Sequence, residues 1–451
     1  MIGNQLTSFL STKKGDRTYP VNYRPISLTC VPCKLLEHIV FSTSSDFLDQ
    51  QNFFTSFQHG FRQKRSCESQ ILTTLKDFTN FLNSSAQTDA VLLDFSKAFD
   101  KVDHKLLLSK INNAGIHGPL LNWMTSFLTN RLQYVVVEGS ISNPSNVLSG
   151  VPQGTVLGPL FFLIYINDIC DNLTPGTFIR LFADDSLLYR VIKTDEDIRI
   201  LQKDLDTLQE WEKKNKMEFH ADKCQVLRIS NKLKPIEGTY NIHGTPLKLF
   251  TSVKYLGITL DSNLNWSEQC NNVFNKASFM MSFLERNLSR CPPKVKEQCY
   301  NSLVRPILDY GCTAWDPFRE NQINKLELIN KRAARFVTGN YTREHGNTEK
   351  NMKTLGWPTL KVRRSRLKLA MFFKINSDMI HIPRDDLVAI PRKPLNFIVP
   401  SSSVDAHLHS FFPSTVRLWN SIPISCKSKP SLDTFKSSLE HITLSHPYYS
   451  K

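Results

Sequence analysis

Apolar runs typical of strands alternate with stretches of helical periodicity over roughly the first 260 residues. Residues 90–93 form a continuous apolar run, as expected of a buried strand, and lead directly into Asp94. Helical spacing follows from Asp103 to Ala114, with Asp103 in position to cap the first turn and Gly115 in position to end the helix. A strand is likewise expected over residues 225–229.

Strand patterns nearly vanish after residue 265, and amphipathic segments separated by proline and glycine take their place. The last of these segments is strongly basic, which fits either a solvated helix face or a phosphate-binding face. From about residue 383 the pattern loosens into a predicted linker, followed by a small unit with Trp419 and a short helix over residues 431–441. The four amphipathic segments span residues 267–287, 293–310, 321–337 and 359–376.

Length and charge narrow the class of protein. A chain of 451 residues is too long to fold around a single hydrophobic core. Its 56 Lys plus Arg against 41 Asp plus Glu leave a net charge of +15. Such an excess favours a polyanionic partner, with nucleic acid ahead of a membrane, because the longest apolar run, residues 159–166, is far shorter than the roughly 20 residues of a membrane span. The N-terminus lacks a secretory pattern, so an intracellular location is expected.

Ten cysteines are scattered along the chain, and Cys30 and Cys33 are the close pair. A zinc site would need a second pair of ligands at suitable spacing. Reduced, packed thiols are therefore favoured over zinc.

Adjacent carboxylates at Asp184 and Asp185 lie between two β-prone runs. Neighbouring negative charges repel unless cations neutralise them, so the pair indicates divalent metal. Asp94 supplies a third carboxylate at the end of a predicted strand. Alone it is more simply a helix cap, but together with the downstream pair it points to two-metal phosphoryl transfer.

These and other segments occur in the order of the reverse transcriptase motifs, and several resemble the non-LTR retrotransposon enzymes of the LINE kind. Residues 94–104 resemble motif A, residues 150–159 motif B and residues 182–185 motif C. The remaining similarities are to two fingers motifs, motifs D and E and the family's thumb, at residues 22–28, 58–62, 222–224, 255–261, 302–311 and 331–335.

The resemblance implies an α+β right-hand polymerase fold with an antiparallel palm sheet, truncated fingers and a helical thumb. It implies an RNA-directed DNA polymerase that uses two Mg²⁺ ions, with Mn²⁺ as an alternative. The expected units are fingers and the start of the palm at residues 1–92, palm at 93–262, basic thumb at 263–380, and a linker with a small C-terminal unit at 381–451. The reverse transcriptase domain itself is expected over residues 22–262.

Roles for single residues follow from the same resemblance. The metal ligands are expected to be Asp94, Asp184, Asp185 and the carbonyl oxygen of Phe95, with Lys223 as the proton donor to pyrophosphate. Phe99 would exclude a ribose 2′-hydroxyl. The residues expected to contact the nucleotide or support the template are Lys14, Arg24, Arg62, Phe99, Gln153 and Gly154. The turn at Leu256 and Gly257 is the expected primer grip. For the basic residues the alternative is an ordinary surface charge, and for Phe99 and Gly154 packing and a tight turn.

The expected partners are an RNA template, a DNA primer, their RNA–DNA hybrid and deoxynucleoside triphosphates, in the nucleus, the cytoplasm or both. Only 21 residues precede the first motif, so an endonuclease is expected to come from a missing N-terminal region or another protein. The main rival is a catalytically inactive, nucleic-acid-binding remnant. A palm-fold nucleotidyl cyclase fits less well, because motifs B and E and the basic thumb serve a template that it would not need. A group II intron maturase fits less well, because the segment after residue 266 resembles the thumb of LINE enzymes.

Overall fold

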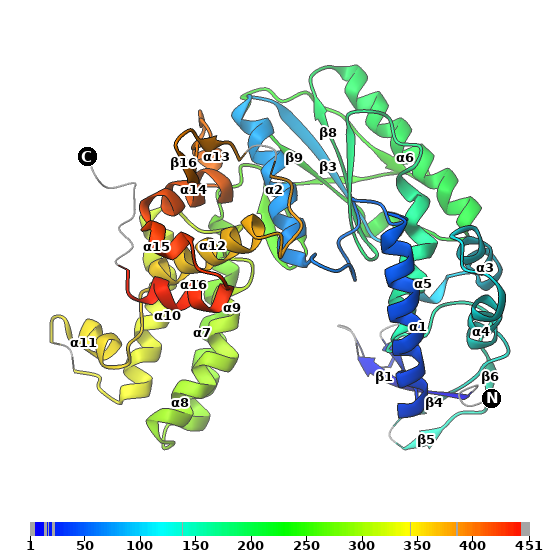
Figure 1. The fold of residues 1–451 in the computed structure, drawn as a ribbon, viewed down its shortest axis with the longest axis horizontal. Coiled ribbons are helices and arrows are strands. Elements are labelled where there is room, and N and C mark those ends of the chain that lie inside the picture. Colours follow the sequence, from blue (N-terminus) through cyan, green and yellow to red (C-terminus); the bar gives the residue numbers. More distant parts are fainter. Residues whose placement is uncertain are drawn as a thin grey trace.

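The computed structural model describes residues 5–12, 16, 18–19, 23–137, 139–342, 344–384 and 387–442. Figure 1 shows an arch with a β-sheet at its top, an arm of N-terminal elements on one side and an arm of C-terminal helices on the other. Helices and strands are both abundant along the chain, which confirms the expected α+β class.

Five strands form the central sheet: β3 (Gln87–Leu93), β7 (Thr177–Phe182), β8 (Asp185–Ile192), β9 (Gln225–Ile229) and β12 (Lys248–Phe250). Their order is β12-β9-β3-β8-β7, and neighbours are antiparallel except β12 and β9. Side chains of β3 alternate between two hydrophobic cores, with Val91 and Leu93 in one and Ala90 in the other. The predicted antiparallel palm sheet of a right-hand polymerase fold is confirmed, with one parallel pair at its edge.

One face of the sheet packs on helices from the first half of the chain. The predicted helix after Asp103 is confirmed, because the Asp103 carboxylate accepts a hydrogen bond from Leu106 N at 3.0 Å and Gly115 follows the helix with φ +89°. No helix in the described part of the chain is long and apolar enough to cross a membrane. The helices of this side are α1 (Val31–Gln50), α3 (His104–Asn113), α4 (Gly118–Leu128), α5 (Leu157–Ile166) and α6 (Asp195–Asn215), with short turns at Ala98–Asp100, Asn167–Cys170 and Ala221–Lys223.

A second sheet lies at the end of the N-terminal arm (Figure 1). Its strands β1 and β2 are antiparallel, whereas β1 and β4 are parallel. Residues 23–28 of the first expected fingers motif form β2. The strands are β1 (Gln5–Thr12), β2 (Tyr23–Leu28), β4 (Leu132–Val137), β5 (Ser140–Ile141) and β6 (Ser145–Asn146).

The other face of the central sheet packs against the hydrophobic core that the C-terminal helices form. The predicted helix over residues 293–310 is interrupted by a π-helical turn, Tyr300–Val304, just before Pro306, which has no N–H to donate. The elements on this side are α2 (Cys67–Asn83) from the N-terminal part of the chain, the β13 (Ser252–Tyr255) and β14 (Ile258–Asp261) hairpin, and the helices α7 (Ser267–Leu288), α8 (Pro293–Cys299), α9 (Arg305–Asp309), α10 (Glu320–Thr338), α11 (Asn347–Thr354) and α12 (Leu360–Asn376). A small strand pair, β10 (Asn241–Ile242) and β11 (Thr245–Pro246), precedes it.

Residues after 387 pack onto α12. Trp419 is almost fully buried and donates its indole N–H to the Leu395 carbonyl at 2.7 Å, while Phe372 of α12 packs on its ring. Part of the segment that the sequence indicates as a linker thus forms a strand pair, and Phe397 of this pair is buried in the core. The elements here are β15 (Ala389–Ile390), β16 (Lys393–Phe397), α13 (Asp405–Leu408), α14 (Phe411–Ser421), α15 (Ile424–Lys427) and α16 (Leu432–Glu440).

Three of the basic residues of α12 form internal ion pairs. Arg363 binds Asp309, while Arg364 and Lys368 both bind Asp316, at 2.6 and 3.0 Å. Arg364 and Lys368 side chains are only 3% and 2% exposed, so they are neither a solvated face nor available to a phosphate. Although burial acts to raise it, the pKa of the Asp316 carboxyl is held at about 2 by the charges of Lys368 and Arg364.

We expect Asp316→Asn to lower the free energy of unfolding by roughly 3 to 5 kcal/mol, because it leaves two buried cations without their counterion. The wild-type pair stabilises the fold fully above the unfolded carboxyl pKa and loses that contribution as the pH falls from about 4 towards 2. Urea unfolding at several pH values measures both effects. Glu349→Gln, which removes the exposed ion pair with Lys331, should cost at most about 1 kcal/mol, and equal losses in the two variants would contradict the prediction.

Candidate active site

Three carboxylates lie at the same end of the central sheet. Ala183 and Asp184 form the two-residue turn between β7 and β8, with Ala183 at φ +54°, and Asp185 begins β8. Leu93 pairs with Ser186 in the antiparallel register, so Asp94, the residue that follows β3, lies opposite Asp185. The fold therefore brings together residues about ninety positions apart in the sequence.

The electrostatics of this end reflect the crowding of negative charge. Asp185 is exposed to solvent, but neighbouring protein atoms partly desolvate its carboxyl. This desolvation, followed in size by repulsion from the charges of Asp184 and Asp94, raises the pKa of Asp185 to about 6. Lys223 Nζ lies 3.3 Å from Asp94 Oδ2 and partly offsets this charge. A group of like charges with one raised pKa favours binding of a cation.

The donor chemistry of this end suits a hard divalent cation. Carboxylate and carbonyl oxygens are the ligands that Mg²⁺ prefers. Asp94 O accepts from His220 N and Ser96 N donates to Glu218 O, so the carbonyl of Phe95 between them faces the opposite side, towards β8. Among the described residues, no three acidic, histidine or cysteine side chains already surround one point, so rotation of these carboxylates would have to complete a metal site.

The turn that carries Asp184 is held by a segment that sequence analysis assigned only to the fingers. Gln58 Oε1 accepts hydrogen bonds from Ala183 N at 2.9 Å and from Gly60 N at 2.8 Å. A Cβ atom on Gly60 would lie 2.3 Å from Ala183 N, so only glycine fits there. Gln58 is 2% exposed, and sequence reasoning missed it because its partner lies 125 residues away. Its placement makes it a positioning residue for the turn.

The loop before α5 is hydrogen-bonded to the segment that follows Asp94 in the sequence. Gln153 Nε2 donates to Asp100 Oδ1 at 2.9 Å, and Val151 N donates to the Phe99 carbonyl at 2.8 Å. The Phe99 ring stacks on Phe162 of α5 with ring centroids 4.3 Å apart. The structure thus brings Phe99 and Gln153 into one region of the molecule.

Gly154 allows this loop to pack against β2. Its φ is +98°, and a Cβ there would lie 3.1 Å from Ser27 O, so a side chain would be both strained and crowded. Ser27 N donates to the Gln153 carbonyl at 2.8 Å. The loop with Gln153 and Gly154 is therefore fastened to β2, the strand that contains Arg24.

The three expected basic contacts differ in their placement. Arg62 bonds to Asp49 at 3.1 Å and its guanidinium lies over the Phe54 ring, so it is turned into the protein and supports the fingers rather than reaching a template. The backbone of Arg24 lies in β2, paired with Ser11. Lys14 lies outside the described residues.

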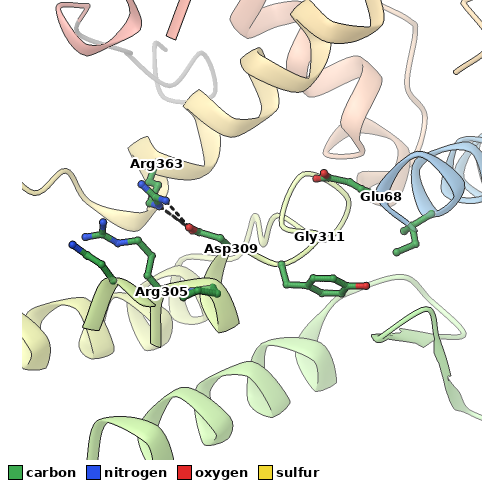
Figure 2. Close-up of a pocket in the computed structure, with 9 residues that line it drawn as sticks. Glu68, Arg305, Asp309, Gly311 and Arg363 are labelled. Carbon is green, nitrogen blue, oxygen red and sulfur yellow. Dashed lines mark hydrogen bonds and ion pairs between the residues drawn. The ribbon is translucent and has the colours of Figure 1, made fainter. Parts of the chain in front are cut away.

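The turn at Leu256 and Gly257 joins β13 to β14, with both residues at positive φ. The Tyr310 hydroxyl donates to the Leu256 carbonyl at 2.8 Å, and a Cβ on Gly257 would lie 3.0 Å from the Tyr310 ring. Tyr310 also lines a pocket of about 440 Å³ between α2 and the C-terminal helices (Figure 2). Figure 2 shows Arg363 joined to Asp309 on one side and Glu68 near Gly311 on another. None of the three sheet-end carboxylates lines this pocket.

Comparison with known proteins places these features in context. Residues 12–260 match the family model described as reverse transcriptase (RNA-dependent DNA polymerase). The chain is 30% identical over 333 residues to the probable RNA-directed DNA polymerase from transposon BS of Drosophila melanogaster, covering 71% of this chain and 36% of that protein. It is 27% identical to the RNA-directed DNA polymerase from mobile element jockey of the same species, with 70% and 36% covered. The chain thus spans about a third of the length of these relatives. A solved apo telomerase from Candida tropicalis aligns with a TM-score of 0.45 and 9% identity over 80% of this chain and 63% of that one.

Proposed function

Because the chain belongs to the reverse transcriptase family, we propose that it is the polymerase part of a non-LTR retrotransposon protein and copies RNA into DNA. The reaction is nucleotidyl transfer from a deoxynucleoside triphosphate to the 3′-hydroxyl of a primer. The observation that carries the proposal is the meeting of Asp94, Asp184 and Asp185 at one end of the sheet. Mobile-element relatives of the same family support it.

Asp94, Asp184 and Asp185, with the Phe95 carbonyl, would hold two Mg²⁺ ions, which when bound activate the attacking oxygen and stabilise the departing pyrophosphate. The bond that forms joins the primer 3′-oxygen to the α-phosphorus, and the bond that breaks releases pyrophosphate. Lys223, whose Nζ lies 3.3 Å from Asp94 Oδ2, would give a proton to the pyrophosphate. The Gln58 contacts keep the Asp184 turn in one geometry throughout.

Nucleotide selection is assigned to the loop before α5 and to Phe99, to which this loop is hydrogen-bonded. The Phe99 ring, fixed by stacking on Phe162, would exclude a ribose 2′-hydroxyl and so favour deoxynucleotides. Gln153 and Gly154 would line the base and sugar pocket, where glycine lets the backbone approach closely. Arg24 and Lys14 would neutralise the triphosphate.

The remaining partners are an RNA template and the growing RNA–DNA hybrid. The net charge of +15 favours phosphate contacts, so binding should weaken with salt. Leu256 and Gly257 would place the primer end, and Tyr310 would link this turn to the helical half through its hydrogen bond to the Leu256 carbonyl. An endonuclease that opens target DNA would be supplied by another part of the mobile-element protein or by a partner.

Primer extension on poly(rA) annealed to oligo(dT), with dTTP and Mg²⁺, tests the proposal directly. We expect extension with dTTP, little with UTP, and none after chelation of the metal. Binding of the hybrid without any extension, across Mg²⁺ and Mn²⁺, would instead support the non-catalytic remnant. Loss of both binding and extension in a folded protein would overturn both functions.

A further inference from the structure

Two thiols meet at the start of α1, on the arm that carries β2. Cys30 precedes the helix and Cys33 lies in its first turn, with their sulfur atoms 3.1 Å apart. Cys30 is exposed and Cys33 is half-buried. Both thiols are free, as expected from the sequence, but the expected packing is wrong for Cys30. Two thiols in contact, one of them open to solvent, are near enough and accessible enough for thiol–disulfide exchange.

The two sulfurs differ in chemical character. The hydrogen bond between the two thiols lowers the pKa of Cys30, whereas burial, followed by the interaction with Cys30, raises the pKa of Cys33 to about 11. The 20-residue helix α1 directs its positive N-terminal end at the pair. An exposed thiol with a lowered pKa beside a protected thiol is the division of roles found in reactive Cys-x-x-Cys pairs, where one sulfur attacks and the other resolves.

The second turn of α1 is hydrogen-bonded to the loop that holds Gln153 and Gly154. Glu37, one helical turn after Cys33, is fully buried and accepts hydrogen bonds from Val156 N at 2.7 Å and Leu157 N at 3.1 Å. These residues lie at the start of α5, which is beside α1 in Figure 1. On the other side of Cys30, β2 contacts the same loop through the hydrogen bond from Ser27 N to the Gln153 carbonyl.

We propose that Cys30 and Cys33 form a reversible dithiol–disulfide site, and that its oxidation alters the loop containing Gln153 and Gly154. Closing the bond draws the sulfur atoms from 3.1 Å to a covalent distance of about 2.05 Å. This movement shifts the first turn of α1, which lies between Ser27 and Glu37, the two residues that are hydrogen-bonded to that loop. The site lies outside the carboxylate centre, and its chemistry does not depend on polymerase activity. Its oxidant is a small disulfide such as oxidised glutathione.

The steps balance as ordinary thiol–disulfide exchange. The Cys30 thiolate attacks one sulfur of oxidised glutathione, and the glutathione S–S bond breaks to release one glutathione thiolate, which takes up a proton. Cys33 then loses its proton to solvent and attacks Cys30 Sγ, which releases the second glutathione. The protein loses two electrons and two protons, and the small disulfide gains both.

Thiol mapping of the native chain tests the bond. Trypsin cuts after Arg17 and Lys34, and the Arg24–Pro25 bond resists cleavage, so residues 18–34 form one peptide that contains both thiols and no other cysteine. After equilibration in glutathione buffers of increasing oxidised fraction, blocking with N-ethylmaleimide and digestion, we expect this peptide to lose both alkylation sites together. Dithiothreitol should restore them.

Hydrogen exchange tests the coupling independently of catalysis. We expect amide exchange over residues 153–157 to change about fivefold on oxidation of the wild-type chain, the lower end of ordinary coupling between two sites. Cys30→Ser should abolish the change without unfolding the protein, because serine is a favourable residue before a helix. Cys291→Ser, at a half-exposed cysteine between α7 and α8, is the matched control and should behave as wild type.

The outcomes are decisive in both directions. A peptide that remains doubly alkylated in oxidised glutathione overturns the redox site, and so does glutathione attached without closure of the Cys30–Cys33 bond. An exchange change that persists in Cys30→Ser overturns the coupling. If the proposed polymerase activity fails while the bond and the coupled exchange are found, the redox site stands by itself.

Discussion

Asp184→Asn is expected to abolish primer extension while leaving the fold intact. The substitution keeps the size of the side chain but removes one of the three negative charges at the end of the central sheet. Loss of a metal-binding carboxylate should cost at least about 4 kcal/mol of transition-state stabilisation, or about a thousandfold in kcat. Single-nucleotide extension under saturating primer–template and dTTP measures this loss. Hybrid binding should change little, because binding depends on basic residues elsewhere.

A metal-free stability measurement makes the prediction specific to the site. The charges of Asp184 and Asp94 act to raise the Asp185 pKa, so removal of one charge relieves repulsion. Thermal unfolding in a chelating buffer should therefore show Asp184→Asn to be at least as stable as wild type. Asp195→Asn, the same change at an exposed position of α6, should retain extension. Substantial extension by Asp184→Asn would remove the basis for the proposed function.

Local features of the fold were predictable because they depend on residues close together in the sequence. The strand over residues 225–229 follows from its apolar pattern, and α3 follows from its spacing and the Asp103 cap. The meeting of Asp94 with Asp185 depends on strand register, which no local pattern specifies. The need of two-metal chemistry for converging carboxylates, and the order of motifs characteristic of a known family, suggested it from the sequence.

Contacts between distant segments were not predictable. The basic run in α12 suggested a surface, but Asp316, 48 and 52 residues before its partners, converts Arg364 and Lys368 into buried ion pairs. The sequence favoured packed thiols at Cys30 and Cys33, but Cys30 is exposed. Its exposure depends on how the rest of the chain covers α1, which the local sequence does not specify. Charge and spacing identify residue types that can do chemistry, whereas burial and pairing, set by tertiary structure, decide whether they are available.

Gly60→Ala is expected to reduce extension by about a hundredfold, since a misplacement of about 1 Å can have that effect on a reacting geometry. The backbone of Gly60 does not require glycine by its φ, so the effect arises from contact alone. The new Cβ would lie 2.3 Å from Ala183 N, so the backbone of Gly60 and the two-residue turn that carries Asp184 must move apart. Overpacking of this kind should also cost about 1 to 3 kcal/mol of stability.

Gly244→Ala separates loss of stability from loss of geometry. Gly244 has φ +73°, and no atom of the described residues lies within 4 Å of the position that a Cβ would take, so alanine there is strained by roughly 1 to 2 kcal/mol but displaces nothing. Both variants should unfold at lower urea concentration than wild type, yet only Gly60→Ala should lose extension, at a temperature where both are folded. Equal activity in the two would show that the Gln58–Gly60 segment does not position the Asp184 turn. A fall in kcat confined to Gly60→Ala, with hybrid binding retained, would instead extend the catalytic centre to a part of the fingers that carries no charge.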